Sequence, residues 1–177
     1  MAVPASYQDL STDPATRDYV GPVWYQREVR IPRGWVGNRV VVHFESATHA
    51  ATVWINDIEV VSHVGGYLPF EVDITDHVRA GKKCRLTVRV DNRLSFQTIP
   101  PGIIVDSPEG PKQKYWHDFF NYAGIHRDVW LCSRPQVHVE DVTITTDIDG
   151  GDGIVTWSVL SHNADLLATR VTIFDDE

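Results

Sequence analysis

The stretch RVVVHFESATHAATVWINDIEVVSHV, residues 39–64, decides the fold class, because it holds three runs that are typical of β-strands. The three runs cover residues 39–47, 51–56 and 59–64. They are rich in β-branched and aromatic residues, and parts of them alternate between apolar and polar side chains, which predicts strands. Asn56 and Asp57 tolerate the positive φ angles of a tight turn, so we expect a hairpin between the second and third runs.

The rest of the chain repeats this rhythm. Further runs of the same kind cover residues 84–92, 137–148, 153–161 and 168–174. No stretch has the period of a long amphipathic helix, and we expect only one helical turn within 74–81, capped by Thr75 or Asp76 and ended by Gly81. Short strands separated by turns predict an all-β sandwich.

Composition limits the possible functions. The chain has 177 residues, is 42% hydrophobic and contains six tryptophans, which is enough to build a core. Its net charge of −8 argues against binding to nucleic acid or to an anionic membrane surface. No apolar run approaches the ~18–20 residues of a membrane span. No signal peptide is visible, so we expect a cytoplasmic protein.

The cysteines and histidines predict neither a metal site nor a cofactor. Cys84 and Cys132 lie far apart, and we expect thiols that are buried rather than a disulfide or a metal pair. His117 and His126 have no thiol nearby, which argues against zinc. The histidines expected to have ordinary structural roles are His43, His49, His63 and His77.

The stretch KYWHDFFNYAGIHRDVWL, residues 114–131, concentrates aromatic, acidic and histidine side chains without a helix or strand period. Two interpretations are open on the residues alone. It is either a packed loop whose polar groups satisfy one another, or one wall of a sugar or metal site.

A boundary is expected near residues 132–136. Only residues 137–177 follow it, whereas an immunoglobulin-like sandwich needs about seven strands and ~100 residues. We therefore expect one domain over 1–134 and part of a second domain over 135–177, with the chain a fragment of a longer protein.

Four motifs carry a resemblance to a known family. They are VWYQREVRIPRGW (23–35), GGYLPFEVDIT (65–75), QTIPPG (97–102) and HDFFNYAGIHRDVWL (117–131). In this order they resemble the N-terminal portion of β-glucuronidases, which are glycoside hydrolases of family 2. The resemblance implies a jelly-roll (galactose-binding-like) sandwich that lacks its first strand, and then the first strands of an immunoglobulin-like sandwich. The catalytic (β/α)8 barrel of that family would be absent.

The resemblance also implies an activity and a division of labour. The whole enzyme would be a retaining glycosidase that releases glucuronic acid from β-D-glucuronides, with two carboxyl groups ~5–5.5 Å apart. Both belong to the barrel, so we expect no catalytic residue in this chain and no turnover by it alone. The expected partner is a glucuronide, bound only together with the barrel.

The resemblance implies that Asp118 accepts hydrogen bonds from sugar hydroxyls, since an ionised carboxylate is an acceptor only. The alternative is a loop carboxylate that caps backbone amides or pairs with Arg127. His117 and Asn121 are expected to support Asp118, although His117 could equally fill space. Gly124 is expected to take a backbone conformation that favours glycine.

The aromatic residues are expected to pack. Trp24, Trp54 and Trp130 are predicted to lie in the core. A set in the loop, predicted to serve core or interdomain packing, consists of Trp116, Phe119, Phe120 and Tyr122.

Three other functions stay open. A stand-alone carbohydrate-binding module would need an exposed aromatic platform. A β-galactosidase-like member of family 2 and a purely structural interaction domain are the others. We also expect the full-length protein to be a homo-oligomer, and residues 137–177 to self-associate or stay mobile. Side chains that would supply an apolar face there are Val142, Ile144, Trp157, Val159, Val171 and Ile173.

Overall fold

The structure is a computed structural model, and it describes residues 1–116, 120–164, 168 and 170–174. The chain divides into two compact units, Met1–Ser133 and Arg134–Glu177, and each is described by itself. The division falls one residue before the expected boundary.

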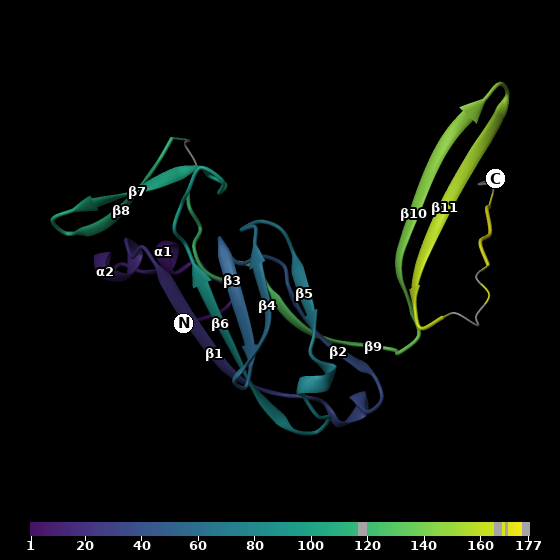
Figure 1. The fold of residues 1–177 in the computed structure, drawn as a ribbon, viewed down its shortest axis with the longest axis horizontal. Helices are drawn as coiled ribbons and strands as arrows, with labels where there is room; N and C mark the ends of the chain where they lie inside the picture. The colour runs from purple at the N-terminus through teal and green to yellow at the C-terminus, as the bar shows by residue number, and fades with distance from the viewer. Residues whose placement is uncertain (117–119, 165–167, 169, 175–177) are drawn as a thin grey trace. The chain divides into compact units, whose positions relative to one another are not determined.

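The larger sheet of the first unit has four antiparallel strands in the order β1-β6-β3-β4 (Figure 1). Their bounds are β1 Pro22–Arg30, β3 Ala50–Ile55, β4 Ile58–Val64 and β6 Lys83–Asp91. Asn56 has φ +56° in the turn between β3 and β4, which confirms the predicted hairpin. The strands predicted at 51–56, 59–64 and 84–92 are therefore confirmed within one residue at either end.

A second sheet has three strands in the order β5-β2-β9. The bounds are β2 Arg39–Phe44, β5 Phe70–Asp73 and β9 Val129–Arg134. Alternate side chains of both sheets share one core, in which Val42 and Phe44 of β2 join Val53 of β3 and Val88 of β6. Two sheets around one apolar layer form the predicted all-β sandwich.

Short elements connect these strands. They are α1 Tyr7–Leu10, α2 Pro14–Arg17, the 3-10 turns η1 Arg33–Trp35 and η2 Thr75–His77, and the hairpin strands β7 Gly102–Ser107 and β8 Gly110–Tyr115. The predicted helical turn is η2, but its cap is Ile74 rather than Thr75 or Asp76. The turn starts earlier because the backbone N–H of His77 donates to the carbonyl of Ile74.

The second unit contains one antiparallel hairpin, called the ribbon here, made of β10 His138–Asp149 and β11 Asp152–His162. Its register pairs Val142 with Val159 and Ile144 with Trp157, so these four side chains share a face, as predicted. The opposite face is mostly polar, with Thr145 paired to Thr156. An immunoglobulin-like completion of this unit stays a prediction.

The strand predicted at 168–174 is wrong for the residues that are described there. Residues 168 and 170–174 form no strand, and Ile173 is 69% exposed. The residues alternate as they would in a strand, but a strand also needs a hydrogen-bonded neighbour.

The core prediction for the tryptophans is also wrong. Trp24 is 61% exposed and Trp130 52%, and Trp54 is only partly buried. Trp24 and Trp54 occupy strand positions between core-facing residues, so the pleat turns them outward. In the 114–131 stretch, Trp116, Phe120 and Tyr122 are also exposed, and Phe119 lies outside the described residues.

Both cysteines are free, with Cys84 buried and Cys132 partly buried, which confirms the prediction of separate thiols. Burial raises the pKa of the Cys84 thiol. None of the helices that the structure describes is long and apolar enough to cross a membrane.

Candidate functional site

The loop before β9 is joined to the segment before β3. The amide of Thr48 donates to the carbonyl of Gly124 at 3.0 Å, and the two residues form an isolated antiparallel bridge. Gly124 has φ +100°, and a Cβ there would collide with the Tyr25 hydroxyl and lie 3.1 Å from the Tyr7 ring. The prediction for Gly124 is confirmed, and the bridge fixes where the loop enters the sandwich.

Asn121 forms a hydrogen bond with His49, a histidine that was expected to have an ordinary structural role. His49 Nε2 and Asn121 Oδ1 are 2.9 Å apart, and the residues are 3% and 5% exposed. Burial lowers the pKa of His49, so the ring is neutral at pH 7. The neutral ring donates its Nε2–H to Asn121 Oδ1. The other polar atom of that side chain, Asn121 Nδ2, is buried and has no hydrogen-bond partner among the described residues.

Another histidine, His126, lies in the loop itself and contacts two hydroxyl groups. His126 Nδ1 lies 3.0 Å from Thr48 Oγ1, and its Nε2 lies 3.3 Å from Ser46 Oγ. Both hydroxyls donate to the carbonyl of Gly66, so the Thr48 oxygen is free to accept from Nδ1–H. Burial lowers the pKa of His126 as well.

A cleft of about 530 Å³ opens beside this loop. It is lined by Pro4, Ala5, Ser6, Asp9, Leu10, Tyr67, Tyr122, His126 and Arg127. The ring of Tyr67 meets that of His126 edge-on at 5.7 Å. The lining of the cleft therefore combines aromatic, aliphatic and polar side chains.

The predicted site residues fall partly outside the described residues. Asp118 and His117 lie in the gap at 117–119, so their expected roles stay predictions. Asn121 is described and pairs with His49, and its expected support of Asp118 stays a prediction. The two residues are 72 positions apart, so no local spacing could have linked them.

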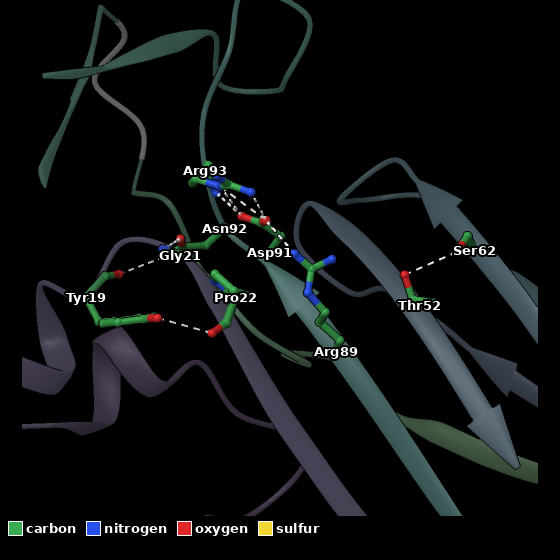
Figure 2. Close-up of polar contacts among 9 residues, drawn as sticks. All are labelled: Tyr19, Gly21, Pro22, Thr52, Ser62, Arg89, Asp91, Asn92 and Arg93. Atoms are coloured by element: carbon green, nitrogen blue, oxygen red, sulfur yellow. Dashed lines mark hydrogen bonds and ion pairs between the residues drawn. The ribbon is translucent and has the colours of Figure 1, made fainter. Parts of the chain in front are cut away.

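A second polar network closes the end of β6 (Figure 2). The Asp91 carboxylate accepts from Arg93 Nε at 2.9 Å and from Arg89 at 3.3 Å. Desolvation opposes ionisation of Asp91, but the hydrogen bonds and charges of the two arginines outweigh it and lower its pKa. Every charged group here is paired with a neighbour, so the network holds the fold rather than a ligand.

Asn92, next to Asp91, is completely buried and fully hydrogen-bonded. It accepts from the amide of Gly21 at 2.8 Å, and it donates to the Tyr7 hydroxyl at 2.6 Å and to the Tyr19 carbonyl at 2.8 Å. Asn92 thus fastens the N-terminal segment to the sandwich, and with it one wall of the cleft.

The sandwich and its loop define a class of protein. The sequence profile described as "Glycosyl hydrolases family 2, sugar binding domain" matches residues 3–135, and the chain belongs to this family. Within the family, its relatives are β-glucuronidases, as the four motifs predicted. It is 48% identical to the β-glucuronidase of Paenibacillus borealis over 90% of this chain and 28% of that protein. It is 38% identical to the β-glucuronidase of Homo sapiens over 100% of this chain and 29% of that protein.

Solved structures agree. The β-glucuronidase of Lactobacillus rhamnosus matches with a TM-score of 0.84 and 37% identity, over 93% of this chain and 28% of that one. The β-glucuronidase of Ruminococcus gnavus in complex with D-glucuronic acid matches with a TM-score of 0.83 and 34% identity, over 91% of this chain and 28% of that one. The chain thus spans less than a third of the length of the curated relatives described here.

Proposed function

We propose that the chain is the non-catalytic N-terminal part of a β-glucuronidase that releases glucuronic acid from β-D-glucuronides with retention. The observation that carries this is the similarity to β-glucuronidases over 90% or more of the chain. The two carboxyl groups of a retaining mechanism would come from the remainder of the parent enzyme.

Within the parent enzyme, Asp118 accepts hydrogen bonds from hydroxyls of the glucuronide. His117 and Asn121 support it. What supports this division is the buried pairing of Asn121 with His49 and the bridge between Gly124 and Thr48, which anchor the chain just after the 117–119 segment. An anchored loop loses little conformational entropy when it binds a substrate.

Hydrolysis of chromogenic substrates tests the proposal. The parent enzyme should cleave a β-D-glucuronide and leave the matching β-D-galactoside intact, whereas residues 1–177 alone should cleave neither. A parent enzyme that prefers the galactoside would favour the β-galactosidase-like alternative. Turnover by the purified 177-residue chain, free of host enzyme, would contradict the non-catalytic role.

A substitution tests Asp118. In the parent enzyme, Asp118→Ala should lower kcat/KM, because each charge-assisted hydrogen bond contributes about 1.5–3 kcal/mol. Asp106→Ala in the β7–β8 hairpin is the matched control and should leave kcat/KM unchanged. If Asp118→Ala instead lowers the Tm and keeps the kinetics, Asp118 is structural.

The remaining parts of the proposal concern assembly and location. The parent enzyme is a homo-oligomer in the cytoplasm, and the 177-residue chain without the remainder either self-associates through residues 137–177 or leaves that segment mobile. The exposed apolar face of the ribbon supports the self-association. Sedimentation of both forms and fractionation of cells test these statements.

A further inference from the structure

The outer face of the four-stranded sheet carries two tryptophans that the core does not use. Val53 and Val88 belong to the core cluster, so their neighbours Trp54 and Thr87 point away from it. The register places Thr87 between Gln26 of β1 and Trp54 of β3. Aromatic and hydroxyl side chains therefore share one flat surface.

The two tryptophan rings meet above β6. The centroids of Trp24 and Trp54 are 5.3 Å apart and the rings are inclined by 31°. Trp24 nevertheless remains 61% exposed. A single exposed tryptophan would be unremarkable, but two in contact on a flat sheet make a continuous apolar platform.

Polar side chains surround this platform. Gln26 Nε2 donates to Thr87 Oγ1 at 3.3 Å, and Ser62 Oγ donates to Thr52 Oγ1 at 3.1 Å. Figure 2 shows the second of these bonds across β3 and β4. These groups keep unused donor and acceptor capacity toward solvent. The tryptophan face is defined by Trp24, Gln26, Thr52, Trp54, Ser62 and Thr87.

The basic side chains of β6 on this face are paired within the protein, and Glu59, opposite Trp54 on β4, accepts from Ser62 Oγ at 3.2 Å. Arg89 pairs with Asp91, Arg85 with Asp57 and Lys83 with Glu28. A surface with paired charges favours a neutral ligand and does not attract a nucleic acid backbone. Of the bases and sugars that stack on aromatic rings, a neutral sugar therefore fits this surface best.

We propose that the tryptophan face binds a neutral oligosaccharide, at a site separate from the Asn121 loop. One face of a pyranose ring presents C–H groups, which suit the electron-rich faces of Trp24 and Trp54. The hydroxyls at its rim pair with Gln26, Thr52 and Ser62. Because two rings form the platform, the ligand spans at least two sugar units. The proposal does not depend on the glucuronidase activity.

Titration of the 177-residue chain with cellohexaose and laminarihexaose tests the proposal. We expect saturable binding of at least one of them, reported by tryptophan fluorescence and by NMR shifts of the Trp24 and Trp54 indole N–H signals. D-Glucuronic acid at the same concentration should leave these two signals unchanged. Trp24→Ala should weaken binding about tenfold, as for a central aromatic contact.

Trp130→Ala is the matched control, because Trp130 is 52% exposed but lies on β9 of the other sheet. It should leave the affinity unchanged. If Trp24→Ala does not fold, the indole shifts of the unmodified chain still decide the question. The proposal is overturned if neither oligosaccharide binds, if Trp130→Ala weakens binding equally, or if Trp24→Ala only abolishes a self-association seen by sedimentation.

Discussion

The sandwich and the ribbon are made of the same kind of strand in different surroundings. Val53 in the sandwich is fully buried, whereas Ile144, also apolar and on a paired strand, is 62% exposed. Both strands have hydrogen-bonded neighbours, so strand pairing does not explain the difference. The difference is explained by the second sheet that covers the apolar face of the sandwich strands, because burial against another sheet is what stabilises an alternating strand.

The largest expected effect contrasts one core residue with one ribbon residue. Phe44 is fully buried and stacks on Phe70 with centroids 4.7 Å apart, so Phe44→Ala should cost about 3–5 kcal/mol. Ile144→Ala, at a side chain that is 62% exposed, should change the free energy of unfolding by about 0.5 kcal/mol or less. Urea unfolding followed by circular dichroism measures both. Similar costs would mean that the ribbon is covered in solution.

The second contrast lies within the first unit, between two glycines. Gly124→Ala places a residue with a Cβ at φ +100°, which costs about 1–2 kcal/mol, and the Cβ clashes with the Tyr25 hydroxyl and crowds the Tyr7 ring, which costs about 1–3 kcal/mol more. Gly37 also has a positive φ, but an added Cβ would meet no atom within 4 Å. Gly37→Ala should therefore show only the first cost in the same unfolding assay. Equal costs would show that the loop moves away from the sandwich freely.

The third prediction concerns pH and applies to the sandwich alone. Burial lowers the pKa of both His49 and His126, so below about pH 6.5 the unfolded chain binds protons that the folded chain does not. Stability should fall as the pH drops from 6.5 toward the lowered values, by at most about 1.4 kcal/mol per pH unit for each histidine.

Unfolding in urea at pH 7.5 and at pH 5.5 checks this. His126→Gln should reduce the difference between the two pH values, while His162→Gln in the ribbon should not. A stability that stays constant over this range would show that the two rings take up protons in the folded chain as they do in the unfolded chain.

The smallest effect on unfolding is expected in the ribbon, where association is the readout. Ile144→Lys should change the free energy of unfolding by about 0.5 kcal/mol or less and abolish self-association through residues 137–177. Thr145→Lys places the same charge on the opposite face and should leave association intact. Sedimentation velocity distinguishes the two variants. Loss of association in both would indicate a charge effect rather than an apolar contact.

The sequence predicted the strands whose apolar runs find a hydrogen-bonded neighbour, as in residues 51–64, whereas the alternating residues described at 168–174 form no strand. It did not predict β1 as a strand, where Arg27 stands at a core-facing position between Tyr25 and Val29. The prediction that Trp24 lies in the core rests on its hydrophobicity alone. It does not take into account the pleat of the strand, which decides to which face of the sheet the side chain points. The site residues His117, Asp118 and Asn121 stay predictions, and the pairing of Asn121 with His49 could not be predicted because the fold brings two distant segments together.

Asn92 has a consequence for the order in which parts of the protein open. Its side chain joins residues 7, 19 and 21 to the end of β6, across separations of up to 85 positions. Further bonds of the same segment join Ala5 to Ile125 and Gln8 to Ala123. Such a long closure costs chain entropy, and a segment that few contacts fasten detaches before the core does. Amide hydrogen exchange should therefore be faster at α1 and α2 than in β3, and Asn92→Ala should accelerate exchange in residues 7–21 while leaving that of β3 unaltered.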